Sequence, residues 1–480
     1  MRSVAIYAVR FIGRFALIPA AAWAAGCAVG PDYHRPTADV PQAWHPDAPW
    51  HEAAPNDAAW KGHWWEVFQD PALDPLVEQA LLGNQNLHVA AARLDQARSQ
   101  VTVARSYLYP DVGLQASASR SKTSANRPLA SYSIPNQSIV QNNFTLGPFV
   151  NYEFDLFGRV RREVEGYRAA AEQAAADFEN TRLMLTAQLA SDYFTLRELD
   201  AEIDVVNHSL ALERDALDFV ASRHDLGLAT GLDLAQQQAL VQSSSAQLEL
   251  LQVQRAQNEH AIATLVGSPA PGFSIAAVAT AGRLPALPVG LPSDLLQRRP
   301  DVAAAERSMA AANARIGVAR AAYFPTIQLM PLVPSVGWQS SAVSSLFNAP
   351  SELWAAGLSA TQTLFDAGRT RANVHIAEQD YTAAVASYRQ TVLTAMEEVE
   401  NGITGLASLD QAAREADASV ESSQRAFDIA NERYKGGLAV YLDVLTAQQA
   451  LLGNQRQAVQ IHGQQFLTAV YLVKALGGGF

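Results

Sequence analysis

The sequence predicts a mainly α-helical fold with a smaller share of β-strand of a kind suited to a membrane. Three observations predict it: long stretches without proline, apolar residues at seven-residue spacing, and shorter segments in which apolar and polar residues alternate. No proline occurs between Phe149 and Ser268, or from Ser351 to the C-terminus. Because proline interrupts a helix, these two stretches can each hold helices of unusual length.

The long helices are predicted by a strict heptad pattern. Apolar residues recur every seven positions from Leu189 through Leu196, Ile203 and Leu210, and a second series runs from Val385 to Tyr434 at the same spacing. A seven-residue period indicates left-handed coiled-coil packing rather than an ordinary amphipathic surface. Helices of about 60 residues would be about 90 Å long, which is too long for a compact globule.

The β-strands are predicted by alternation. Residues 112–119 alternate apolar and polar side chains, and the apolar residues of 144–154 share one face. Residues 326–338 and 352–365 are similar, although Pro331 and Pro334 weaken the first of these two. Strands of about ten residues have the length of a membrane β-barrel. Four strands cannot close a barrel, and open edges are unfavourable in lipid, so several chains must combine.

The chain also contains an internal duplication, which has the order helix, strand, strand, long helix, tip, helix. RHDLGLATGLDLAQQQ, starting at Arg223, matches RYKGGLAVYLDVLTAQ, starting at Arg433, after a shift of about 210 residues. Both segments are polar, glycine-containing breaks between helical patterns, and we interpret them as the tips of helical hairpins. The predicted repeats are residues 71–270, with a tip at 225–233, and residues 271–480, with a tip at 435–443.

Composition excludes several classes of function. The chain has 480 residues, of which 49% are hydrophobic and 17% charged, so it can bury large cores. A net charge of −12 argues against a nucleic-acid partner. The single cysteine excludes a disulfide framework and a cysteine-rich metal site. The ten histidines are scattered, and neither a phosphate-binding glycine loop nor a nucleophile motif occurs. We therefore expect no enzyme activity, no catalytic residues, no metal and no cofactor.

The N-terminus has the layout of a secretory signal. Residues 1–26 carry arginines, then an apolar run, then small residues ending in AAGC at Cys27. This resembles a bacterial lipoprotein signal, in which cleavage precedes a cysteine that is then lipidated; the resemblance implies a covalent lipid, such as palmitate, on Cys27. An ordinary signal peptide with an incidental cysteine is the alternative. Residues 27–70 are rich in Pro and Trp, and we expect a lipid-anchored, extended strap.

Two motifs connect these features to a known family. CAVGPDYHRP at Cys27 and WWEVFQDPALDPLVEQALLGNQNL at Trp64 resemble the TolC-like outer-membrane efflux proteins, in their OprM- or NodT-type lipoprotein branch. The resemblance covers nearly the whole mature chain. It implies a homotrimer whose four strands per chain build one twelve-stranded β-barrel, continued by a long coiled-coil α-helical barrel.

The resemblance also implies a function. The chain would be the passive exit duct of a tripartite efflux pump, carrying small toxic compounds from an inner-membrane transporter, expected to be proton-driven, to the exterior. A periplasmic adaptor, or membrane fusion protein, would join the two. The chain would lie in the outer membrane, in contact with its lipid, and extend into the periplasm.

The tips would be where the adaptor binds. The residues in position to contact adaptor hairpins are Gly227, Leu228, Gly437 and Leu438. A glycine allows close backbone approach, and a leucine supplies a small apolar contact. Helix termination alone also accounts for these residues, so both interpretations stay open.

The resemblance places a gate at the second tip. Three copies of Asp443 would face one another in a closed trimer, and like carboxylates in proximity repel. Family members also bond a Tyr to an Asp across hairpins, and Tyr434 and Asp233 occupy those positions. Asp233 could instead be a helix-starting acid. The family's arginine and second acid are replaced by Ala439 and Thr446, so we expect a looser resting closure.

Two alternatives remain at the level of sequence. The duct could serve type I protein secretion rather than small-molecule efflux, because the sequence shows no substrate pocket. The chain could also be a coiled-coil lipoprotein scaffold of the envelope that forms no pore.

Overall fold

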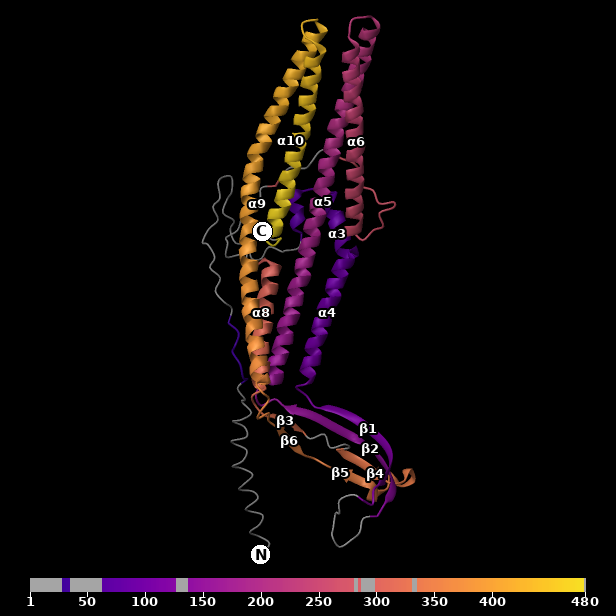
Figure 1. Ribbon diagram of the computed structural model, residues 1–480, viewed down its shortest axis with the longest axis vertical. Coiled ribbons are helices and arrows are strands. Elements are labelled where there is room, and N and C mark those ends of the chain that lie inside the picture. Colours follow the sequence, from indigo (N-terminus) through magenta and orange to yellow (C-terminus); the bar gives the residue numbers. More distant parts are fainter. Residues whose placement is uncertain are drawn as a thin grey trace. The chain divides into compact units, whose positions relative to one another are not determined.

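The computed structural model describes residues 28–34, 63–126, 137–279, 284–285, 298–329 and 335–478 (Figure 1). The predicted signal peptide, Cys27 and most of the predicted strap lie outside these residues. Two compact units make up the chain. Unit 1 comprises Met1–Pro36, Leu94–Ala174 and Ala305–Tyr388, and unit 2 comprises Thr37–Arg93, Ala175–Ala304 and Arg389–Phe480. Each unit takes segments from both predicted repeats, so the compact units do not follow the repeat boundary at residue 270.

The helices nevertheless come in pairs of equal length. Helices α5 (Arg159–Asp225) and α9 (Arg369–Lys435) have 67 residues each, and α6 (Gly231–Leu265) and α10 (Tyr441–Ala475) have 35 each. A shift of 210 residues superposes both pairs. The remaining described helices are α3 (Leu73–Gly83), α4 (Gln85–Ser106), α8 (Pro300–Ala321) and the 3₁₀ helices η1 (Trp64–Phe68), η2 (Val343–Ser345) and η3 (Ala349–Ser351).

The heptad positions of the long helices are buried or half-buried, as coiled-coil packing requires. Leu189 and Leu196 of α5 are each 0% exposed, and Val399 of α9 is also 0% exposed. At 1.5 Å per residue, a helix of 67 residues is about 100 Å long. No helix within the described ranges is both long enough and apolar enough to cross a membrane.

Unit 1 contains an antiparallel sheet (Figure 1). It has four rows, where a row is either one long strand or two short strands that follow each other along the same line of the sheet. The first two rows are β1 (Asp111–Thr123) and β2 (Ile139–Phe154), which pair from Asp111 opposite Asn151 to Thr123 opposite Ile139. The other edge of β2 pairs with the short strands β3 and β4, and these pair in turn with β6 and β5. The short strands are β3 (Thr326–Leu329), β4 (Val336–Ser340), β5 (Glu352–Trp354) and β6 (Leu358–Thr361).

The third and fourth predicted strands are therefore each divided in two. Pro331 and Pro334 lie between β3 and β4, outside the described residues. Residues 355–357 separate β5 from β6, and the amide of Ala355 still donates to the carbonyl of Ser335 at 2.8 Å. The two segments thus continue along the same row of the sheet, so the four predicted strands correspond to four rows built from six strands.

An aromatic cluster forms the centre of unit 2, at the base of the hairpins. Phe68 of η1 lies 4.8 Å, centroid to centroid, from Phe194 of α5, which stacks on Phe466 of α10 at 4.8 Å. Trp64 and Trp65 complete the cluster and are buried. The WWEVF segment identified in the sequence therefore attaches η1 to both hairpins.

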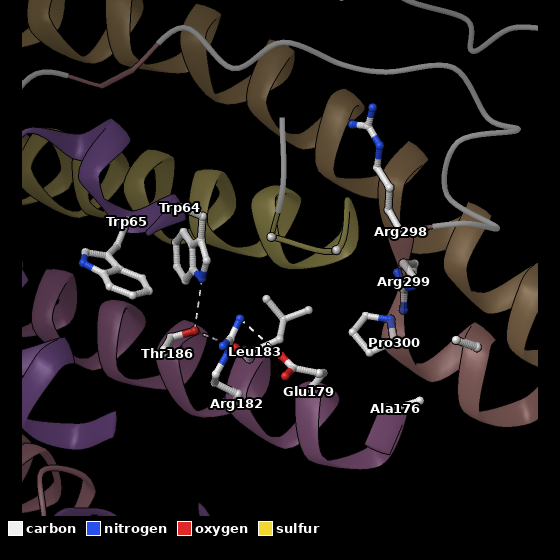
Figure 2. A pocket seen from close by; sticks show the side chains of 13 residues that line it. Trp64, Trp65, Ala176, Glu179, Arg182, Leu183, Thr186, Arg298, Arg299 and Pro300 are labelled. Carbon is white, nitrogen blue, oxygen red and sulfur yellow. Dashed lines mark hydrogen bonds and ion pairs between the residues drawn. The ribbon is translucent and has the colours of Figure 1, made fainter. Parts of the chain in front are cut away.

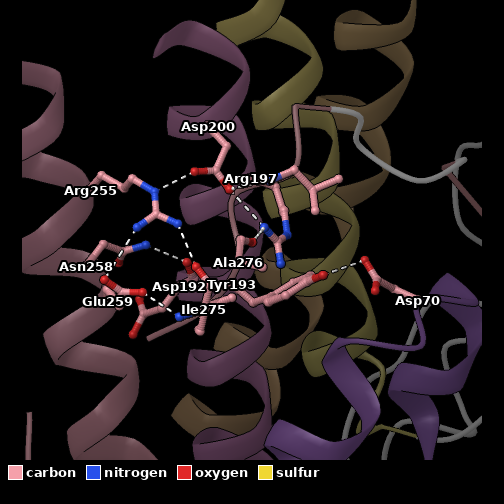
Figure 3. A network of polar contacts seen from close by, with 11 residues as sticks. Asp70, Asp192, Tyr193, Arg197, Asp200, Arg255, Asn258, Glu259, Ile275 and Ala276 are labelled. Atoms are coloured by element: carbon pink, nitrogen blue, oxygen red, sulfur yellow. Dashed lines mark hydrogen bonds and ion pairs between the residues drawn. The ribbon is translucent and has the colours of Figure 1, made fainter. Parts of the chain in front are cut away.

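A buried ionic network holds the segment after α6 against the first hairpin (Figure 3). Asp200, whose side chain is 1% exposed, bonds to Arg197 at 2.8 Å and to Arg255 at 2.6 Å. The same two arginines donate to the backbone carbonyls of Ala276 and Ile275, each at 2.8 Å. Because both arginines are paired and the carboxylate accepts from both, this buried charge cluster is mutually compensated. It gives the first hairpin a rigid base.

Candidate functional site: the paired helical tips

Both tips end their first helix in the same way. In the first tip, the amide of Gly227 donates to the carbonyl of His224 at 2.8 Å, and that of Leu228 donates to Arg223 at 2.7 Å. In the second tip, Gly437 and Leu438 make the corresponding bonds at 3.0 and 2.8 Å. This pair of bonds defines a Schellman motif, which requires a left-handed residue. Gly227 and Gly437 supply it, with φ of 74° and 71°.

The tips differ in how the second helix begins. Thr230 and Asp233 form a reciprocal capping box, because the Asp233 carboxylate accepts from the Thr230 amide at 2.9 Å and the Thr230 hydroxyl accepts from the Asp233 amide at 3.2 Å. At the second tip Val440 occupies the N-cap and has no side chain able to make this bond. Within the described residues, the Asp443 carboxylate has no hydrogen-bond partner, and the residue is exposed. Asp233 is thus engaged in capping, whereas Asp443 is free.

Both tips expose apolar side chains. Leu228 is 63% exposed and Leu438 is 74% exposed, and their leucine or valine neighbours are exposed as well. A Cβ added at Gly227 or Gly437 would meet nothing within 4 Å, so the backbone is open to approach from outside the chain. Exposed apolar groups around an accessible backbone are features of a binding surface for another protein.

Tyr434 lies in a small core beneath the second tip. It is 8% exposed and packs in a cluster with Val220, Tyr441 and Val444. The guanidinium carbon of Arg223 lies 5.2 Å from the centroid of the Tyr434 ring, a cation–π contact. Burial raises the pKa of Tyr434; Arg223 opposes this shift and Asp233 adds to it. Within the described chain, Tyr434 makes no hydrogen bond to Asp233, so the structure brings the two close together without forming the expected bond.

Below the tips, one hydrogen bond joins the two hairpins and a second continues it within the first hairpin. The Tyr441 hydroxyl donates to the Oε1 atom of Gln237 at 2.6 Å, and the Gln237 amide nitrogen donates to the backbone carbonyl of Glu213 at 2.7 Å. Tyr441 is visible in the sequence of the second tip as a bulky residue, but sequence reasoning did not predict its bond and missed Gln237 and Glu213. The available signal was the repeat itself, because Ala447 and Ser423 stand at the positions equivalent to Gln237 and Glu213.

A cavity of about 280 Å³ lies in unit 2, beside Trp64 (Figure 2). Its lining mixes apolar and charged groups, including Glu179, Arg182 and Arg299. These charges are engaged, since Arg182 pairs with Glu179 at 3.2 Å and Arg299 pairs with Asp301 at 2.7 Å. The Trp64 indole donates to the Thr186 hydroxyl at 3.0 Å. The cavity offers no catalytic arrangement, and within the described residues no group of three or more His, Cys, Asp or Glu could hold a metal ion.

Comparisons with known proteins identify the family. Residues 76–268 and 291–478 match the outer membrane efflux protein family. The chain is 31% identical to the solvent efflux pump outer membrane protein SrpC of Pseudomonas putida, over 95% of this chain and 96% of that protein. It is also 31% identical to the pyoverdine export outer membrane protein OpmQ of Pseudomonas putida, over 92% of each chain.

Solved structures agree. The outer-membrane channel OprN superposes with a TM-score of 0.84 at 31% identity, covering 94% of this chain and 99% of that one. The MtrE outer membrane channel of Neisseria gonorrhoeae, described as an open state, superposes with a TM-score of 0.81 at 28% identity, covering 94% and 98%. These relatives are transport channels and not enzymes, as the sequence predicts for this chain. The fold class is likewise confirmed: the protein belongs to the outer membrane efflux protein family, with the TolC-like architecture of a helical barrel and a β-barrel.

Proposed function

We propose that the protein is the passive exit duct of a tripartite efflux pump, working as a homotrimer whose twelve sheet rows close one barrel in the outer membrane. The open sheet is the observation that carries this proposal. In the described residues, β1 pairs only with β2, and β6 only with β3. Unpaired strand edges are unfavourable in lipid, and pairing with further copies of the chain satisfies them.

The apolar side chains of the outer rows support the same conclusion. Trp354 of β5 is 79% exposed, and Leu364 and Phe365, which follow β6, are 93% and 88% exposed. Side chains of this size are unfavourable in water, at about 25 cal/mol per Å² of apolar surface. Lipid or a neighbouring copy would cover them.

We place adaptor contact at the helical tips and gating at Asp443. The exposed Leu228 and Leu438, beside Gly227 and Gly437, form the contact surface for a periplasmic adaptor that links the duct to a proton-driven inner-membrane transporter. The unpaired Asp443 supplies the acidic ring of the gate, with Tyr434 supporting it from below. Asp233 supports the gate indirectly by holding the start of α6.

A covalent lipid on Cys27 completes the proposal. The support is the sequence pattern before Cys27, and mass spectrometry of protein extracted from membranes tests it. We expect acyl groups on Cys27; an unmodified thiol would contradict the lipid anchor and leave the duct itself unaffected.

Reconstitution in planar bilayers tests the duct directly. The full-length protein should form stable trimers in detergent and conduct ions across a bilayer. Trimers that never conduct, or a chain that stays monomeric, would support the pore-free scaffold instead.

Substrate class is tested in cells. Relatives are named for the efflux of solvents and the export of pyoverdine, so we expect small toxic compounds here. A deletion strain grown on a broad panel of toxic compounds should show increased sensitivity, which the intact gene restores. Wild-type sensitivity of the deletion strain to every compound, together with loss of an exported protein, would favour type I secretion.

The adaptor surface has its own test. Leu438→Asp should weaken binding of the co-purified adaptor while the trimer persists, because the residue is exposed and its replacement removes no buried contact. Leu250→Asp, in the middle of α6 and 60% exposed, is the matched control. If both variants bind the adaptor equally well, the tips are not the adaptor-binding surface.

A further inference from the structure

A buried chain of polar groups ties the second tip to the first hairpin. Tyr441, the first residue of α10, is 4% exposed, and Gln237 of α6 is 0% exposed. Their bond at 2.6 Å and the bond from Gln237 to the Glu213 carbonyl at 2.7 Å connect α10, α6 and α5 in sequence. Because these groups are removed from water, separating them costs more than separating an exposed pair.

This chain ends at the backbone carbonyl of Glu213; the residue is 0% exposed, so its side-chain carboxyl is buried beside the same chain. Its Oε1 atom accepts a bond from the Ser209 hydroxyl at 3.0 Å, whereas its Oε2 atom is buried and has no partner within the described residues. A buried, ionised carboxylate without a compensating cation is strongly unfavourable. Burial accordingly raises the pKa of Glu213, opposed by the hydroxyls of Ser244 and Ser209. Packing of the hairpins therefore favours the protonated form of this carboxyl.

We propose that Tyr441, Gln237 and Glu213 form a latch that holds the second tip closed against the first hairpin, and that a proton on Glu213 keeps the latch shut. The inference rests on the proposed duct function, since it concerns how that duct opens. Moving the second tip away breaks the bond from Tyr441 to Gln237 and admits water to Glu213. The carboxyl then loses its proton to solvent, and the charged form resists burial again.

The direction of the pH effect follows from this proton balance. The latched state binds one proton more than the open state, so acidic pH favours the latched state. Its stability is lost as pH rises through the raised pKa of Glu213. The latch should thus open more readily above the raised pKa of Glu213 than below it.

The neighbouring titratable groups do not reverse this direction. From α10, Tyr441 faces Glu213, and its pKa is raised by burial and, to a lesser extent, by Tyr434, Asp233 and Glu213. Tyrosines with raised pKa values stay neutral throughout the mildly acidic to mildly basic range. Asp233 of α6 is half-buried and bonded to Thr230, and α6 otherwise presents to Glu213 the uncharged Gln237 and Ser244.

The sequence repeat shows that the latch acts at one tip. Under the shift of 210 residues, Gly231 occupies the position of Tyr441, Ala447 that of Gln237, and Ser423 that of Glu213. The equivalent contact between the first tip and the second hairpin therefore lacks the hydroxyl, the amide and the carboxyl. The two tips can respond differently to one change in pH although their backbones end alike.

Conductance measured against pH tests the latch. The wild-type trimer in a planar bilayer should conduct more as pH rises through the raised pKa of Glu213. Glu213→Gln, which matches the neutral acid in size, should conduct weakly at every pH. Tyr441→Phe should shift the closed-to-open ratio about fivefold towards open at acidic pH, for a hydrogen bond of about 1 kcal/mol. Glu249→Gln, which changes an exposed acid of α6, is the control and should behave as wild type.

Two results overturn the inference without affecting the duct. If Glu213→Gln responds to pH as the wild type does, a proton on Glu213 does not control the latch. If the conductance of Tyr441→Phe is unchanged, the bond from Tyr441 to Gln237 is not a latch. Hydrogen exchange of the first turn of α10 gives a second measurement that needs no conductance. Tyr441→Phe should accelerate this exchange while the trimer remains intact on a gel. Equal exchange in the wild type and in Tyr441→Phe contradicts the latch. A wild-type protein that conducts nothing contradicts the proposed function instead.

Discussion

The contrast between Asp233 and Asp443 leads to a quantitative prediction. Asp233→Ala removes two bonds that its carboxylate accepts from Thr230, from the amide at 2.9 Å and from the hydroxyl at 2.8 Å. Loss of a capping interaction costs about 1 kcal/mol. Since RT is about 0.6 kcal/mol, the first turn of α6 should open about fivefold more often, and its amides should exchange about fivefold faster.

Asp443→Ala should change hydrogen exchange less than Asp233→Ala does and should change ion conduction more. No side-chain cap is lost, because Val440 makes none, and only the interaction of the acid with the helix dipole disappears. That interaction is worth about 0.3–1 kcal/mol at an exposed helix end, so exchange at the start of α10 should rise about two- to fivefold, which is less than at α6, where the cap is lost in addition to the same dipole interaction. Cation preference in a planar bilayer should fall, since a ring of negative charge is lost from the proposed gate.

Replacement by asparagine separates the cap from the charge. Asn is as good an N-terminal hydrogen-bond acceptor as Asp but carries no charge. Asp233→Asn should therefore exchange nearly as wild type, whereas Asp443→Asn should lose cation preference as fully as Asp443→Ala. Equal loss of cation preference from substitutions at the two sites, or fast exchange after Asp443→Ala alone, would refute the division of roles.

Two further predictions concern unit 2. Burial, reinforced by the charge of Glu202, raises the pKa of Glu198 to about 7. The folded state therefore binds the Glu198 proton more tightly than the unfolded state does. Thermal stability should fall as pH rises through 7, and it should fall less in Glu198→Gln. Thermal scans at either side of neutrality check this, and identical slopes in both proteins would contradict it. Phe68→Ala, which removes a ring that is 3% exposed, should cost about 3–5 kcal/mol in the free energy of unfolding, measured by denaturant titration. A cost below about 1 kcal/mol would show that the aromatic cluster is not a true core.

The long helices and their tips could be predicted from sequence because local rules determine them. The heptad series containing Leu189 and Val399 marked the buried face, and Gly227 and Gly437 marked both helix ends by the conformation that glycine tolerates. The duplicated segment then predicted that both tips would have the same backbone. Family resemblance was needed for the number of copies, the partners, the function and the gate.

The interruptions in the sheet and the latch could not be predicted in the same way. Residues 326–338 and 352–365 are apolar enough to be read as continuous strands, but pairing along a row depends on partners far away in the chain. The bond from Tyr441 to Gln237 joins residues 204 positions apart, beyond the reach of any periodicity. Glu213 shows no local signal either, because a glutamate on a long helix ordinarily lies on a solvated surface.

The duplication supplied two equivalent hairpins, and a few substitutions made them unequal. The backbone of each tip is held by the same Schellman bonds, so the turns themselves cannot account for different behaviour. The difference begins one turn later: Thr230 fixes Asp233 as a cap, whereas Val440 leaves Asp443 free. Tyr441, which stands where the first repeat has Gly231, then reaches across to the other hairpin. A symmetric gate would have to move both hairpins at once. In the gate proposed here, these side chains would let the second hairpin be held and released against the first, which would remain still.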